Sequence, residues 1–143
     1  MKSLAGCDPT LKDSVKPGKK ALPQAHAKRI GVTIPHEILS SVDFDNSVQK
    51  KYPEHARWDY LLEIRVTPQL RSTYAVEFHS IELSKVLKKQ SDTQSILLQL
   101  CDPKPTVDRW ILVPEGSTSS ASRQTVLKLA QKGIEVSRRM LQL

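Results

Sequence analysis

The stretch WDYLLEIRVTPQLRSTYAVEFHS, residues 58–80, decides the fold. Two runs, 57–66 and 72–81, alternate between apolar and polar positions on either side of a short polar turn, and a period of two is typical of β-strands. The first run has one wholly apolar face, made of Trp58, Tyr60, Leu62, Ile64 and Val66. The second run has a matching face, made of Tyr74, Val76 and Phe78. We therefore predict a β-hairpin whose apolar faces lie against helices.

Three polar side chains of this hairpin are candidate site residues: Asp59, Glu77 and His79. Residues two apart in a strand share a face, so Glu77 and His79 point the same way. If the strands pair antiparallel with paired residue numbers that sum to about 138, Asp59 lies opposite His79 and beside Glu77. Two carboxylates and an imidazole would then meet at one end of the hairpin, as a divalent-cation site requires. The turn at 67–72 is too long to fix this register by itself.

The rest of the chain predicts helices around the hairpin. An opening helix runs from about Pro35 to Tyr52, and a long helix begins at the cap residue Ser80, with a break near 91–93. A loop at 101–106 leads to a short strand at 109–114, and a serine-rich loop caps a helix at 123–132 that ends at Gly133. Residues 140–143 are a candidate edge strand. This order predicts an α/β fold with a small mixed β-sheet flanked by helices.

The charge of the chain is concentrated at its N-terminus. Seven Lys and Arg residues stand against two Asp residues in residues 1–30, which leaves +5 of the total net charge of +7. We interpret residues 1–29 as a flexible basic arm and residues 30–143 as a single α/β domain. The arm would act as a solubility tail or as a non-specific phosphate-binding segment. The excess of Lys and Arg over Asp and Glu favours an anionic partner, and nucleic acid is the commonest partner of this kind.

The two cysteines, Cys7 and Cys101, form neither a CxxC pair nor a Cys/His cluster, so we expect no structural zinc site and no disulfide framework. A reducing cytoplasm is the matching compartment. The apolar runs are too short to span a membrane, and the N-terminus lacks the apolar core of a secretory signal. We therefore expect a cytoplasmic protein that does not insert into membranes.

The remaining candidates have structural interpretations. Trp58 and Trp110 lie in predicted strands and are expected in the core. Three histidines are interpreted as surface residues: His26, His36 and His55. Five basic residues are interpreted as a solvated helix surface rather than a binding surface: Arg123, Lys128, Lys132, Arg138 and Arg139.

The hairpin and the elements after it resemble the PD-(D/E)xK restriction-endonuclease-like superfamily over residues 35–143. Asp59 in RWDYLL matches the first metal-binding Asp of that superfamily, and Glu77 in YAVEFH matches its second acid. His79 stands where the superfamily usually has a catalytic Lys, and Trp58 stands where Pro is often found. The resemblance implies a restriction-endonuclease-like core.

This resemblance also implies a Mg²⁺- or Mn²⁺-dependent nuclease of DNA or RNA, in which Asp59 and Glu77 bind the metal and His79 orients the water or acts as the general base. Lys85 is the nearest lysine that could replace the missing one, whereas Lys88 and Lys89 are expected to be solvated. Nucleases of this kind often dimerise, so a homodimer is possible. The alternatives are a catalytically inactive scaffold that binds nucleic acid or protein, with Glu77 and His79 as a structural pair, and an effector of a mobile element.

Overall fold

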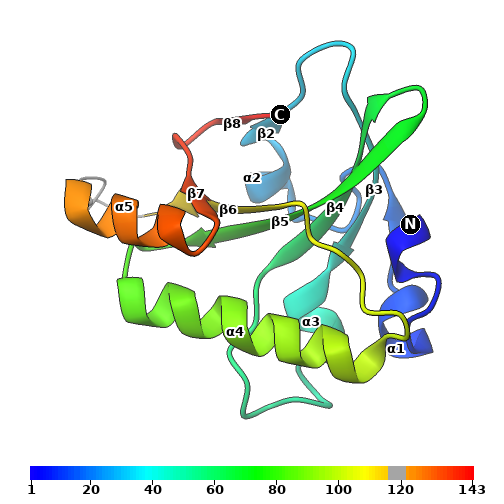
Figure 1. Cartoon of the computed structure of the whole chain (residues 1–143). Helices are drawn as coiled ribbons and strands as arrows, with labels where there is room; N and C mark the ends of the chain where they lie inside the picture. Colours follow the sequence, from blue (N-terminus) through cyan, green and yellow to red (C-terminus); the bar gives the residue numbers. More distant parts are fainter. Residues whose placement is uncertain (116–121) are drawn as a thin grey trace.

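The structure, a computed structural model, describes residues 1–115 and 122–143 and confirms an α/β fold (Figure 1). Six strands form a mixed sheet in the order β1-β3-β4-β5-β6-β7, and β2 and β8 form a separate parallel pair. The strands are β1 (Lys16–Pro17), β2 (Ile30–Gly31), β3 (Glu37–Asp43), β4 (Tyr60–Thr67), β5 (Leu70–His79), β6 (Arg109–Pro114), β7 (Ile134–Val136) and β8 (Leu141–Gln142). The helices are the 3₁₀ helix η1 (Lys2–Leu4), α1 (Pro9–Lys12), α2 (Gln24–Ala27), α3 (Phe44–Val48), α4 (Leu83–Leu100) and α5 (Arg123–Gln131).

The predicted hairpin is present as β4 and β5, which pair antiparallel. The predicted register pairs residues whose numbers sum to about 138. In the structure Tyr60 pairs with Val76, so the sum is 136 and the strands are aligned differently. A register irregularity between Arg65 and Thr67 near the turn sets this alignment. One step beyond the Tyr60 pair, the position opposite Asp59 is therefore that of Glu77 and not that of His79.

The two faces of the sheet are covered differently from the prediction. Helices α4 and α5 lie on one face, where Leu61 and Ala75 join the larger hydrophobic cluster (Figure 1). The wholly apolar face of the hairpin, with Tyr60, Leu62 and Val76, instead packs against residues from the N-terminal third and the last three residues. The expectation that this face lies against helices is corrected: short segments around α2, β2 and β8 cover it.

The opening helix predicted from Pro35 to Tyr52 is wrong over most of its length. Residues Glu37–Asp43 form β3, which pairs antiparallel with β4, and only α3 is helical. The serines and aspartates here are mediocre helix formers. Pairing with β4 on one edge, and with β1 at Ser40 and Ser41 on the other, supplies backbone hydrogen-bond partners instead. Because β3 covers it, β4 is a central strand, so the hairpin strand is not an outer strand open to a second subunit.

Residues 1–29, expected to be a flexible arm, are folded onto the rest of the chain. Leu4 and Leu11 are fully buried in the larger cluster, and Leu22 is buried on the opposite face of the sheet. The backbone N–H of Lys2 donates to Glu63 Oε2 at 2.9 Å. The segment carries few apolar residues, but burial of its leucines offsets the cost of ordering it.

The cysteines are also corrected by the structure, because Cys7 and Cys101 form a disulfide. The pairing joins the N-terminal segment to the end of α4, across a sequence separation of 94 residues that no local spacing pattern announces. Disulfides are rare in reducing compartments, so the cysteine argument for a reducing cytoplasm no longer holds. Across the described ranges, no helix has both the length and the apolarity to cross a membrane.

Helix α4 is continuous through the predicted break at 91–93. The side chains expected to interrupt it serve the preceding loop instead: Thr93 Oγ1 accepts from the N–H of Trp58 and Asp92 Oδ2 from the N–H of Ala56, both at 2.8 Å. This helix links β5 to β6, which are parallel. The predicted strand at 109–114 is confirmed as β6, and most of the serine-rich loop before α5 lies outside the described residues.

The C-terminal elements follow local signals closely. Ser122 Oγ accepts from the N–H of Thr125 and caps α5, and Gly133 ends the helix with a φ of 76°. Strand β7, not predicted, follows at once and pairs with β6. The predicted edge strand forms as β8, which pairs with β2 rather than with the main sheet.

Candidate active site

Asp59 and Glu77 meet where β4 begins and β5 ends. The N–H of Asp59 donates to Glu77 Oε1 at 2.9 Å, and the N–H of Phe78 donates to Asp59 Oδ2 at 2.9 Å. Each strand therefore holds the carboxylate of the other through its backbone, which fixes both side chains relative to the sheet. The predicted meeting of these two acids is found, although through a different register.

The cation beside them is Lys89 of α4, whose ammonium donates to Glu77 Oε2. The Glu77 side chain is 0% exposed and the Lys89 side chain 22%. The expectation that Lys89 is solvated is wrong, and Lys85, the predicted substitute lysine, is 65% exposed and pairs with Glu82 at 3.0 Å. The available signal was helical spacing, because Lys89 stands three residues after Val86 and four before Thr93, both buried.

The environment favours the protonated forms of both acids. Burial, followed by the nearby charge of Asp59, raises the pKa of Glu77 to about 8 even though Lys89 acts in the opposite direction. Burial also raises the pKa of Asp59, partly offset by the Phe78 N–H. Two carboxylates that are buried close together repel each other when both are ionised. A proton shared between them, or a bound cation, would reduce this repulsion.

His79 is not part of this group. It follows Glu77 on the same strand face, as predicted, but its Nδ1 lies 2.7 Å from the carbonyl oxygen of Ser80, to which it donates. None of the hydrogen bonds found among the described residues joins His79 to Asp59 or Glu77. The predicted water-orienting role of His79 therefore has no contact that supports it, and the basic side chain that contacts Glu77 is that of Lys89.

A second polar cluster, missed by the sequence interpretation, lies on the reverse face of the same strand ends. His26 Nδ1 is 2.7 Å from the hydroxyl of Tyr60, and His26 Nε2 is 3.1 Å from Glu115 Oε1. The imidazole stacks on Phe78 with ring centroids 4.0 Å apart and an angle of 4° between the planes. His26, interpreted as a surface residue, is half-buried and links the N-terminal segment to β4, β5 and the end of β6.

The carboxylates that a hard divalent cation could use here are a pair, Asp59 and Glu77, and not a cage of three or more side chains. In the described part of the chain, no group of three or more His, Cys, Asp or Glu side chains is placed to hold a metal ion. Mg²⁺ needs only one or two carboxylates when water and substrate phosphate supply its other ligands. Asp59 and Glu77 supply two carboxylates, but Glu77 is 0% exposed and its oxygens accept from the N–H of Asp59 and from Lys89, so a cation would have to displace one of these partners.

Comparison of the chain with protein-family models, curated proteins and solved structures finds no match. The functional argument therefore depends on the geometry of the residues. The structure brings together two carboxylates, each fixed by the backbone of the other's strand, and a lysine that contacts the buried carboxylate.

Proposed function

We propose that the protein is a metal-dependent phosphodiesterase that cleaves nucleic acid at Asp59, Glu77 and Lys89. The observation that carries the proposal is the contact of Lys89 with a fully buried Glu77 that is itself bound to the backbone of Asp59. Buried acids are rare unless they are paired or bind a ligand, so this grouping at a sheet end favours a functional site. The net charge of +7 suits a polyanionic substrate.

Each residue has a defined task in this proposal. Asp59 and Glu77 would hold Mg²⁺ or Mn²⁺, which as a Lewis acid would polarise the scissile phosphate. The ammonium of Lys89 would orient the attacking water or neutralise charge on the phosphate. In the hydrolysis, water adds to phosphorus, one P–O bond breaks, and the leaving oxygen takes up a proton. Cleavage of both strands of a duplex would need two such sites, for which a homodimer is the simplest arrangement.

A second candidate function is a non-catalytic module that binds nucleic acid or protein on the same scaffold. The observation that favours it is that both oxygens of Glu77 already accept hydrogen bonds, from the N–H of Asp59 and from Lys89. A charge compensated in this way needs no metal, so the group would then serve only to join α4 to the hairpin.

Metal titration separates the two candidates. Calorimetry with Mn²⁺ and Mg²⁺ should detect binding to the native protein that is lost in Asp59→Asn and Glu77→Gln. The matched control is Glu63→Gln, because Glu63 is another buried acid on β4 but bonds to Lys2 rather than to the site. Binding that survives in all three variants, or no binding even with an oligonucleotide present, would reject the metal site and leave the binding module.

Cleavage assays then test the chemistry. We expect metal-dependent cleavage of single-stranded or duplex DNA or RNA by the native protein, and none in EDTA. Lys89→Ala should remove the activity, whereas His79→Ala should retain it. The opposite pattern, with His79 required and Lys89 dispensable, would contradict the assignment of Lys89.

A further inference from the structure

A cleft of about 450 Å³ lies near the start of β5, where three parts of the chain meet. Its walls come from residues 2–6, from the first residues of β5, and from the loop at 103–108 between α4 and β6. Thr73 of this cleft stands four residues before Glu77, which is about 13 Å along a strand. The cleft is therefore separate from the candidate active site, and its volume falls in the range of about 300–1,000 Å³ that small-molecule sites occupy.

Hydrogen bonds of Thr73 join β5 to both of the other walls. The N–H of Thr73 donates to Asp108 Oδ2, and its carbonyl oxygen accepts from the N–H of Asp108, both at 2.8 Å. The hydroxyl of Thr73 donates to Ser3 Oγ, also at 2.8 Å. Because Thr73 is buried, these bonds are shielded from water and fix the strand, the N-terminal segment and the loop relative to one another.

The N-terminal wall and the loop are also joined to each other, next to the Cys7–Cys101 disulfide. The N–H of Asp102 donates to the carbonyl oxygen of Gly6 at 3.0 Å. The two backbones approach so closely that a Cβ at residue 6 would clash with the carbonyl oxygen of Asp102. Walls that are fixed in this way need little ordering when a ligand binds, and this favours affinity.

Three basic residues line the cleft: Lys2, Arg71 and Lys104. Among the described residues, the ammonium groups of Lys2 and Lys104 have no carboxylate oxygen within 4.0 Å, and Arg71 has only Glu63 Oε1, at 3.8 Å. The carboxylate in the lining, that of Asp108, already accepts from a backbone N–H. The lining therefore has an excess of positive charge, which an anion from outside the protein would balance.

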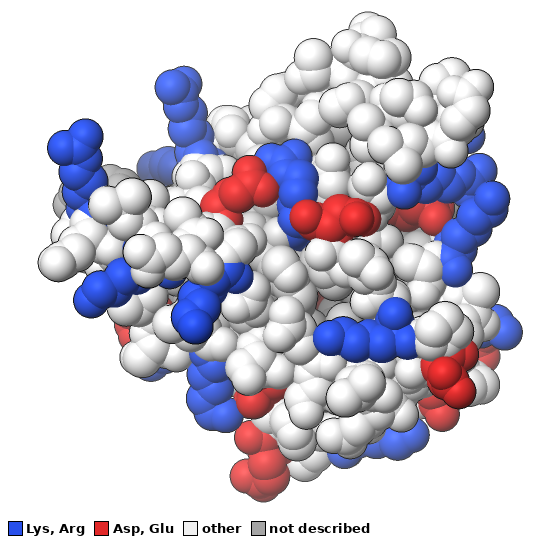
Figure 2. Space-filling model, viewed as in Figure 1, with Lys and Arg blue, Asp and Glu red and all other residues white. Residues whose placement is uncertain are grey.

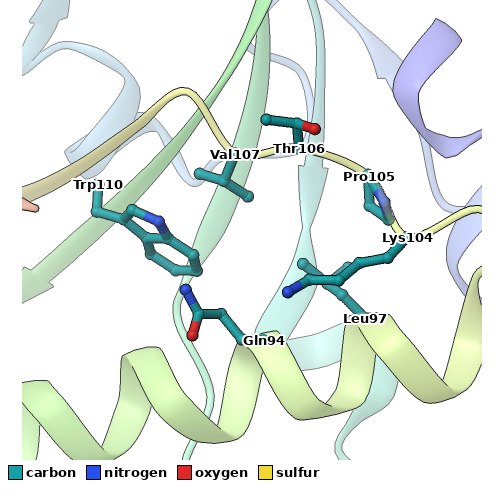
Figure 3. A pocket seen from close by; sticks show the side chains of 7 residues that line it. All are labelled: Gln94, Leu97, Lys104, Pro105, Thr106, Val107 and Trp110. Carbon is teal, nitrogen blue, oxygen red and sulfur yellow. The ribbon is translucent and has the colours of Figure 1, made fainter.

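Lys104 stands at the border between the cleft and a neighbouring pocket beside α4. Its side chain extends across that pocket towards Gln94 (Figure 3). Lys104 is exposed, and exposed side chains change rotamer within nanoseconds, so an anion in the cleft can attract its ammonium. Figure 2 shows further Lys and Arg side chains on the right of the view, where Figure 1 places the N-terminal segment.

We propose that this cleft binds a small molecule through a phosphomonoester group, with Arg71 and Lys2 as its cationic partners and Lys104 at the rim. A phosphomonoester carries a charge of about −1.5 to −2 at pH 7 and three strong acceptor oxygens. The guanidinium of Arg71 can donate two parallel hydrogen bonds to such a group. The Ser3 hydroxyl accepts from Thr73 and keeps its own O–H for donation to the ligand.

The organic part of the ligand has an apolar surface to contact, because Ala5 and Pro103 line the same cleft and are exposed. A ligand with both parts would therefore bind more tightly than its phosphate alone. The inference goes beyond the proposed function, since it involves neither a metal ion nor the group of Asp59, Glu77 and Lys89.

Amide chemical shifts can locate such a ligand directly. We would titrate glucose 6-phosphate into the ¹⁵N-labelled full-length protein in EDTA, with glucose, sulfate and inorganic phosphate in parallel titrations. Saturable shifts are expected at the backbone amides of Ser3, Arg71 and Thr73, and not at those of Asp59 and Phe78. Glucose, which lacks the anion, should cause no saturable shifts in the cleft.

Two variants test the cationic partners. Arg71→Ala and Lys2→Ala should each weaken binding several-fold, and both remove exposed side chains, so the fold should be retained. Lys50→Ala, which removes an exposed lysine outside the cleft, is the matched control and should bind as the native protein does. Asp59→Asn should also bind normally, so that loss of the proposed catalysis and loss of this site are distinguishable.

The possible results separate the parts of the proposal. Absent shifts, or equal binding by the native protein and both cleft variants, would overturn the cleft as an anion site. Equal affinity for sulfate would overturn the choice of a phosphomonoester, and equal affinity for inorganic phosphate would overturn the role of Ala5 and Pro103. Reducing the Cys7–Cys101 disulfide should weaken binding several-fold in protein whose amide spectrum shows that it remains folded. Unchanged affinity after reduction would overturn the role of the disulfide in fixing the walls.

Discussion

Replacing Glu77 by Gln should change how the stability of the metal-free protein depends on pH. Glu77 is fully buried, and its pKa is raised from an ordinary value of 4.5 to about 8. The folded protein therefore keeps a proton that the unfolded chain releases, so the free energy of unfolding falls as pH rises through this window. At about 1.4 kcal/mol for each pKa unit, the whole shift corresponds to at most about 5 kcal/mol. We expect a measured loss of about 2–4 kcal/mol between about pH 5 and pH 8, because the strand ends relax.

The assay is urea unfolding in EDTA at several pH values across that window, followed by the fluorescence of the two buried tryptophans. The native protein should lose stability steadily as pH rises, and Glu77→Gln should flatten the dependence. Glu63→Gln is the matched control and should retain the native slope, because Glu63 is a similarly buried acid of β4, 4% exposed, that bonds to the N–H of Lys2 and not to Asp59 or Glu77. A flat profile for the native protein, or an unchanged slope in Glu77→Gln, would refute the reasoning about the buried pair.

Three further outcomes follow from the contacts. Lys89→Ala should lower the rate of nucleic-acid cleavage by at least about 100-fold, because it removes a charge beside the reacting phosphate, and Lys85→Ala should leave the rate within about twofold; equal losses would contradict the choice of Lys89. His26→Ala should lower the free energy of unfolding by about 1–3 kcal/mol, because the Tyr60 hydroxyl loses its hydrogen-bond partner and the Phe78 ring loses its stacking partner. An unchanged midpoint of urea unfolding would show that the His26 cluster does not stabilise the fold. Reducing the Cys7–Cys101 disulfide should lower stability by up to about 4 kcal/mol for so long a loop, measured as thermal unfolding with and without dithiothreitol; identical curves would mean that the bridge does not constrain the unfolded chain.

The parts of the fold that the sequence predicts are those governed by local sterics. Alternation along 57–66 and 72–81 is enough for the hairpin, because strand geometry sends successive side chains to opposite faces. The helix after Ser122 and its end at Gly133 follow from a side-chain cap and from a backbone conformation that favours glycine. These signals depend on neighbours within a few residues.

The parts that could not be predicted depend on distant partners. Strand β3 is extended because β4 offers it an edge, which its own serines and aspartates do not announce. The hairpin register depends on an irregularity near the turn. A change of two in the sum of paired residue numbers places Glu77, and not His79, opposite Asp59. Lys89 reaches Glu77 only because α4 crosses the sheet at that level, so its role follows from packing and not from motif spacing.

The ends of β4 and β5 bring the two polar clusters back to back. Asp59 and Tyr60 are consecutive, as are Glu77 and Phe78, so the carboxylates face α4 while the rings face His26 on the other side. The N–H of Phe78 is itself the donor to Asp59, so a shift of the ring stacked on His26 would move a hydrogen bond of the site. The N-terminal segment therefore supports the candidate active site from behind, and its basic residues cannot be treated as a free arm.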